Sequence, residues 1–278
     1  MSLARILLPV FSHPDFGSIA ATAFTIAGDQ RAMIEGLYAY TAPGKQVHLY
    51  YEAAAPEVMD QLLKDAERRC QDAANTAKET FDRFAAEHSA VSTSFVTTDF
   101  GLQDGVASRG RLCDLTVVGV PPEGDEYPWP VIRDAALFRT GRPVLIVPKG
   151  QDSAAFARTV VIGWKDSVEA ARAVQTARPF LAKAKSIRLV SAGHDAVSQG
   201  ELDELKDYMS LSFKNVAAEV VASGKNDSAA LLLREVSREP GSLLVMGAYS
   251  RWKWSEAIFG GVTDYILNNA TVPVLMMH

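Results

Sequence analysis

The sequence predicts an α/β fold of two tandem halves, each with a five-stranded, mostly parallel sheet and helices on both faces. Three observations support this prediction. The chain repeats itself, strand and helix signals alternate within each half, and the strand signals are nearly continuous apolar runs. Parallel strands need a crossover helix between them, and helices on both faces bury the sheet on both sides. Alternating elements with unbroken apolar strands are therefore typical of doubly wound α/β proteins.

The repeat consists of three pairs of apolar segments that occur in the same order in both halves. They are residues 6–10 with 160–164, 115–119 with 243–247, and 143–147 with 273–277. The offset falls from 154 residues in the first pair to 128 and 130 in the others, so the first half carries about 25 extra residues between its first and fourth strands. We expect an N-terminal domain over residues 1–150 and a C-terminal domain over 156–278, joined by the polar stretch 149–153.

The elements of the second half follow from local periodicity. Short apolar, β-branched runs predict strands, and apolar residues at helical spacing predict the helices between them. The expected strands are 159–164, 187–191, 216–221, 243–246 and 272–277, and the expected helices are 170–181, 202–213, 229–236 and 257–269.

The extra length of the first half is mostly one long helix. Apolar residues recur every three or four positions from Val58 to His88, with charged residues on the other face. Such a stripe either packs on the helix's own sheet or binds a partner helix, and we expect the first of these. Cys70 lies in this stripe and is expected to be an inert, small apolar residue.

Composition excludes several classes of protein. Of the 278 residues, 48% are hydrophobic, as in a globular chain and not a disordered one. The net charge of −5 argues against non-specific nucleic-acid binding, and two cysteines are too few for a disulfide framework or a zinc site. The first residues are typical of a strand and not of a signal peptide, and the longest low-charge stretch, residues 16–28, is too short to cross a bilayer. We therefore expect a cytoplasmic protein.

Candidate ligand-binding residues follow the strands of the second half, because doubly wound sheets bind ligands beyond the carboxyl ends of their strands. Gly247 ends the fourth strand, and the small-residue turn 260–263 after it would expose backbone N–H groups to a phosphate. Hydroxyls of Ser250 and Thr263 would add donors. Arg251 and Lys253 would supply positive charge.

These residues carry a resemblance to the universal stress protein family, in its tandem form with two such domains on one chain. Nucleotide-binding members have a Gly-x2-Gly-x9-Gly-Ser/Thr pattern after the fourth strand. Here it falls on Gly247, Ser250, Gly260 and Gly261, of which the first and third match. The terminal segment 270–276 also resembles the family.

The resemblance implies several properties of this chain. The fold would be Rossmann-like, of the adenine-nucleotide alpha-hydrolase type, and the protein would bind ATP or a related ligand in a stress response without dedicated catalysis. The last strands of the two halves would pair within the chain as an internal pseudo-dimer, and two chains could form a homodimer. The residues expected at the nucleotide are Gly163, Trp164, Lys165, Ser191, Gly247, Ser250, Gly260, Gly261, Val262 and Thr263.

One departure from the family bears directly on the ligand. Members place an aspartate at the end of the first strand, where it contacts the nucleoside, and here that position is Lys165. A lysine donates hydrogen bonds and accepts none, although Asp166 follows it directly. The substitutions at Lys165, Ser250 and Gly261 also fit a second hypothesis, a ligand-free scaffold whose pocket has closed.

The first half is a poorer candidate for a nucleotide site. After Gly119, residues 120–130 contain four prolines, which lack N–H groups, and three acidic residues, which repel phosphate. We expect this half to be structural. A slow ATPase is a third hypothesis, but no motif positions a general base, and the five histidines lack metal-ligand spacing. Cys113 precedes a core strand and is expected to be buried. No catalytic and no metal-binding residue is therefore expected.

Overall fold

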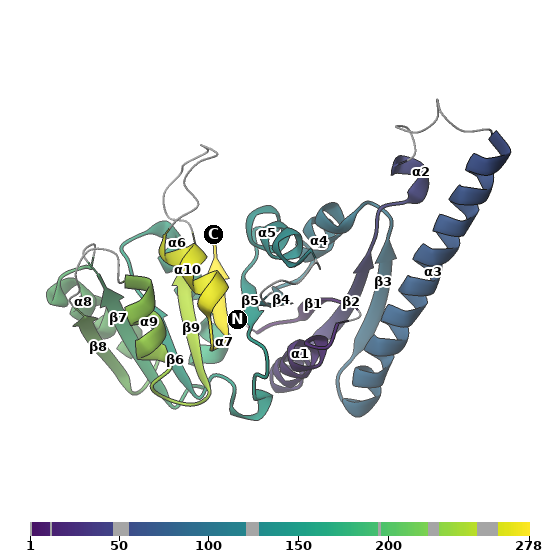
Figure 1. The fold of residues 1–278 in the computed structure, drawn as a ribbon. Helices are drawn as coiled ribbons and strands as arrows, with labels where there is room; N and C mark the ends of the chain where they lie inside the picture. The colour runs from purple at the N-terminus through teal and green to yellow at the C-terminus, as the bar shows by residue number, and fades with distance from the viewer. Residues whose placement is uncertain are drawn as a thin grey trace.

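A computed structural model describes residues 2–11, 13–46, 56–120, 128–193, 196–221, 228–248 and 261–278. Within these residues one ten-stranded sheet runs through both halves in the order β3-β2-β1-β4-β5-β10-β9-β6-β7-β8 (Figure 1). Its strands are β1 (Arg5–Pro9), β2 (Met33–Ala39), β3 (Thr93–Thr98), β4 (Leu115–Gly119), β5 (Val144–Val147), β6 (Thr159–Gly163), β7 (Ser186–Ala192), β8 (Val216–Val221), β9 (Ser242–Gly247) and β10 (Val274–Met277). The α/β prediction with two similar halves is confirmed.

The two halves meet at their last strands. β5 and β10 pair antiparallel, with Leu145 opposite Leu275 at the centre of the register, whereas the other strand pairs are parallel. The strand order on one side of this join mirrors the order on the other. The structure therefore contains the pairing within one chain that the resemblance implies.

The helices cover both faces of the sheet. One apolar core contains buried residues of α1 (Phe16–Gln30), α3 (Pro56–Glu87), α6 (Val168–Thr176), α7 (Arg178–Leu181) and α8 (Gln199–Ser210). The opposite core contains buried residues of α4 (Leu102–Gly110), α5 (Trp129–Arg139), α9 (Ser228–Val236) and α10 (Val262–Asn269). Short helices α2 (Pro43–Gln46) and η2 (Ser153–Ala155) lie in connections. None of the described helices is both long and apolar enough to span a bilayer.

A buried ion pair ties the second strand of each half to a helix, and the charges are reversed between the halves. In the first half, Glu35 of β2 is 2% exposed and accepts two hydrogen bonds from Arg109 of α4, both 2.7 Å. In the second half, Arg188 of β7 donates to the carboxylate of Glu235 in α9 at 2.9 Å.

The two pairs occupy equivalent positions. Glu35 lies opposite Leu7 of β1, and Arg188 lies opposite Val161 of β6, the residue that matches Leu7 in the repeat. Arg109 and Glu235 are each the last residue but one of their helix. Each half therefore places opposite charges at these two positions, in opposite order.

The long helix α3 corrects part of the prediction for the first half. Ala77 and Phe81 are buried, but Val58 and Leu62 are more than half exposed, so only the second part of the stripe packs on the sheet. The 32 residues of α3 extend about 48 Å, whereas the six residues of β3 extend about 20 Å. The N-terminal part of α3 consequently projects past the sheet (Figure 1).

Three further expectations, for Cys113 and for two helices, can be compared with the structure. Cys113 is buried as expected, and this burial raises the pKa of its thiol to about 12. The helix expected over 170–181 is divided into α6 and α7 next to Pro179, which cannot donate a backbone hydrogen bond. The last helix begins at Val262, and residues 257–260 of the expected range lie outside the described residues.

We predict that Glu35→Gln lowers the free energy of unfolding by about 2–3 kcal/mol, because it leaves the Arg109 guanidinium without its carboxylate in a largely buried place. The charge-swapped double variant Glu35→Arg with Arg109→Glu should recover most of this loss, since the second half already uses that order. Urea denaturation followed by circular dichroism measures both. A double variant less stable than the sum of its single substitutions would contradict the equivalence of the two pairs.

Candidate functional site

In each half, the connections leave the sheet in opposite directions at one point, between β1 and β4 and between β6 and β9. Such switch points leave a crevice beyond the carboxyl ends of the strands, where doubly wound proteins bind ligands. The residues at this crevice differ between the two halves. This difference decides which half is the better candidate for a ligand-binding site.

In the second half, Ser191 connects two loops at this edge. The residue is 1% exposed, and its Oγ donates to the carbonyl of Trp164 at 2.9 Å and accepts from the backbone N–H of Val197 at 3.1 Å. Its hydroxyl proton is therefore used inside the protein. The predicted site residues Trp164 and Ser191 are brought together, but Ser191 positions the Trp164 backbone and offers no free donor.

The glycines at the strand ends allow helices to approach closely. A Cβ on Gly247 would lie 2.6 Å from the backbone nitrogen of Ala170, so the first turn of α6 rests directly on the end of β9. A Cβ on Gly163 would lie 2.7 Å from the side chain of Leu232 in α9. Packing alone accounts for both glycines.

Lys165 is half-buried and lies in the connection between Gly163 of β6 and Ser167, the N-cap of α6. The Oγ of Ser167 accepts a hydrogen bond from the Ala170 N–H at 3.2 Å.

At the start of α10 the N-cap is Gly261, which has an extended backbone and provides no side-chain cap. Within the described part of the chain, no atom would lie within 4 Å of a Cβ added to Gly261. Val262 is 38% exposed, whereas Thr263 is buried. Ser250 and Gly260, with Arg251 and Lys253, lie outside the described residues.

In the first half, aromatic side chains fill the corresponding place. Gly119 ends β4, and a Cβ there would lie 2.5 Å from Ile19 and 2.7 Å from the Trp129 ring. Trp129 is 1% exposed and meets the ring of Phe11 edge-to-face at 4.5 Å between centroids. The Trp129 ring also meets the ring of His13, at 5.5 Å between centroids. These rings occupy the space that a ligand would need.

The helix that follows, α5, offers fewer donors than α10. It begins at Trp129, flanked by Pro128 and Pro130, and neither proline has an N–H group. The filled crevice and the missing donors both agree with a structural role for the first half.

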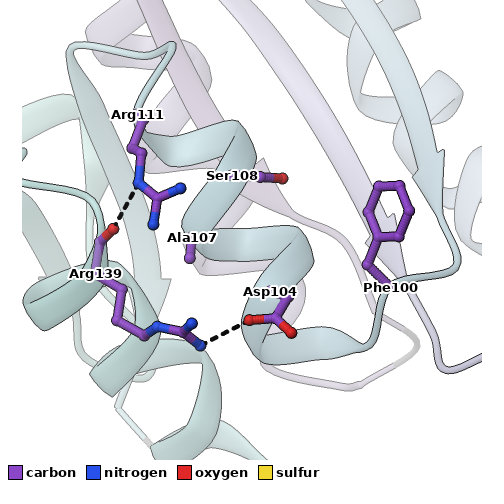
Figure 2. Close-up of a pocket in the computed structure, with 6 residues that line it drawn as sticks. All are labelled: Phe100, Asp104, Ala107, Ser108, Arg111 and Arg139. Carbon is purple, nitrogen blue, oxygen red and sulfur yellow. Dashed lines mark hydrogen bonds and ion pairs between the residues drawn. The ribbon is translucent and has the colours of Figure 1, made fainter.

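A separate pocket of about 420 Å³ lies in the first half, between α4 and the C-terminal end of α5 (Figure 2). It is lined by Phe100, Asp104, Ala107, Ser108, Arg111 and Arg139. None of these residues stands out in a motif of the sequence. The available signal was a comparison of the repeats, since the residues at equivalent helix positions in the second half are uncharged.

Comparison with known proteins identifies the family of the second half. Residues 157–278 match the model of the Universal stress protein family. This C-terminal half belongs to the universal stress protein family. No curated protein sequence matches the chain.

Solved structures extend the likeness to the whole chain. A universal stress protein from Archaeoglobus fulgidus DSM 4304 superposes with a TM-score of 0.71 at 11% identity, over 98% of this chain and 97% of that one. A putative universal stress protein from Pseudomonas aeruginosa UCBPP-PA14 gives 0.59 at 15% identity, over 99% and 93%. At such identities the likeness shows the fold, and it includes both halves. The recognition of a tandem universal stress protein architecture is thus confirmed.

We predict that Trp129→Ala lowers the free energy of unfolding by about 3–5 kcal/mol, because it empties a fully buried site next to Gly119. Leu211→Ala, at a residue that is 84% exposed, serves as the control and should change stability little. Urea denaturation monitored by circular dichroism compares the two. Equal, small losses would mean that the Trp129 ring does not fill this crevice.

Proposed function

We propose that the C-terminal half binds ATP or a related nucleotide at the carboxyl edge of β6 and β9, in a stress response and without catalysis. The supporting observation is the contrast between two equivalent helix starts. α5 begins among prolines and a buried tryptophan, whereas α10 begins at a glycine whose added Cβ would meet no atom of the described residues.

The start of α10 suits a phosphate group on electrostatic grounds. The first N–H groups of a helix have no partners within the helix, and the N-terminus carries about half a positive charge. Gly261 contributes no side chain that would take these donors. Asp264 in the first turn opposes an anion. The proposed site therefore needs a cation, and Lys165 at the end of β6 is the candidate among the described residues.

The scaffold hypothesis is supported by different observations. Ser191 uses its hydroxyl internally, and Gly163 and Gly247 are explained by helix packing. The two hypotheses differ on one point, which is whether the space beside Gly261 is used by a ligand. Among the described residues no cluster of three or more His, Cys, Asp or Glu side chains could bind a metal ion.

The first experiment is denaturation of gently purified protein with mass spectrometry of any released small molecule, followed by ATP titration calorimetry. Adenine nucleotide at one per chain supports the proposal. Absence of both a released nucleotide and binding heat at millimolar ATP supports the scaffold. Steady release of ADP under the same conditions would instead support a slow ATPase.

We predict that Gly261→Leu weakens ATP binding by at least about tenfold, because the added side chain enters the open space before α10 without backbone strain. Gly44→Leu is the matched control, since an added Cβ on Gly44 would also meet open space, but in the first half. Calorimetry of both variants measures the effect. Unchanged affinity in Gly261→Leu would place any nucleotide elsewhere.

We predict that Lys165→Asp weakens ATP binding by about tenfold or more, because it removes the cation proposed to face the phosphates and adds a carboxylate that repels them. Lys165→Ala removes the positive charge without adding a negative one and should weaken binding less. Calorimetry of both variants measures the effect. Stronger binding in Lys165→Asp would contradict this role for Lys165 and would mean that the position contacts the nucleoside, as the aspartate of the family does.

A further inference from the structure

The pocket at α4 and α5 contains two arginines, each of which is positioned by one interaction (Figure 2). Arg111 follows the last residue of α4, and its Nε donates to the backbone carbonyl of Arg139 at 3.0 Å. Arg139 ends α5, and its Nη1 lies 2.8 Å from Oδ1 of Asp104 in α4. One interaction therefore fixes each guanidinium without using most of its donors.

Both arginines keep most of their N–H donors within the described part of the chain. A guanidinium has five N–H groups, and only the Nε–H of Arg111 has a partner within the described part of the chain. Asp104 neutralises one of the two positive charges, so the pocket retains a net charge of about +1 from these three residues. Its chemistry suits an anion with several oxygens, for which the planar fork of arginine is adapted.

The remaining walls add an apolar surface. Phe100 is 60% exposed and lies across α4 from the two arginines (Figure 2), and Ala107 is buried. The Oγ of Ser108 donates to the carbonyl of Gly105 at 3.2 Å. The volume of about 420 Å³ falls within the usual range for small-molecule sites. A ring that lines the same pocket as the two arginines fits a ligand that carries a planar ring as well as a charge.

The second half shows that the fold does not need these charges. α9 and α10 pack on each other as α4 and α5 do. The third residue of α9 is Ala230 where α4 has Asp104, and the residue after α9 is Ser237 where α4 is followed by Arg111. α10 ends at Asn269 where α5 ends at Arg139.

We propose that this pocket is a binding site for a small phosphate monoester with a planar ring. The phosphate contacts the Nη groups of Arg111 and Arg139, and the ring lies against Phe100. The site is separate from the carboxyl edge of β6 and β9 and does not depend on nucleotide binding there.

Phenyl phosphate is the probe, because it combines the two required groups, and calorimetry on the full chain measures its affinity. Arg111→Ala should weaken binding by about tenfold or more, since a charge-assisted contact is lost. Arg172→Ala, at an exposed arginine of α6, is the matched control and should change nothing. Asp104→Asn should strengthen binding, because it removes the carboxylate that competes for Arg139.

Two further variants test the role of the ring and the separation of the two sites. Phe100→Ala should reduce the affinity for phenyl phosphate to that for inorganic phosphate, and circular dichroism of each variant checks that it is folded. Gly261→Leu should bind phenyl phosphate normally, which separates this pocket from the proposed nucleotide site. Absence of saturable binding at millimolar probe, or equal affinities in Arg111→Ala and Arg172→Ala, would overturn the proposal.

Discussion

The antiparallel pairing of β5 with β10 is the constraint on which the rest of the structure depends. Three residue pairs, centred on Leu145 and Leu275, convert two five-stranded sheets into one sheet of ten strands. An antiparallel join between similar halves implies a rotation about an axis perpendicular to the sheet. This rotation keeps equivalent helices on the same face, so α1 and α6 share one core, and α4 and α9 share the other.

The duplication provides an internal comparison of what the fold needs and what each half has changed. Both halves keep a buried ion pair between the second strand and a helix, although the charges are exchanged between Glu35–Arg109 and Arg188–Glu235. The pair is thus common to both halves, and its polarity is not. The crevice beyond β1 and β4, by contrast, is filled by Trp129, whereas no atom of the described residues would contact a Cβ added to Gly261 at the start of α10. Differences of this second kind separate the roles of the two halves.

Local periodicity predicted the strands of the second half and the length of α3, because both patterns are properties of neighbouring residues; β2 and β3 of the first half were not predicted. It did not predict that Val58 and Leu62 are exposed, because an apolar stripe carries no information about where the sheet ends. Contacts between distant residues were also missed. Glu35 and Arg109 are 74 residues apart, and the ring of Trp129 is recognised as the filling of a crevice only once β4 and α5 are in place. The α4–α5 pocket depends on such contacts as well.

The β5–β10 join also restricts how two chains could associate. Each of these strands already has a partner on both sides, so the last strands cannot pair with a second copy. The sheet ends instead at β3 and β8. At β8, the side chain of Gln199 accepts from the N–H of Val220 at 3.1 Å and donates to the carbonyl of Ala218 at 3.5 Å, so it occupies one donor and one acceptor that an added strand would use. A homodimer, as the family resemblance suggests, would therefore have to form through a surface other than the last strands.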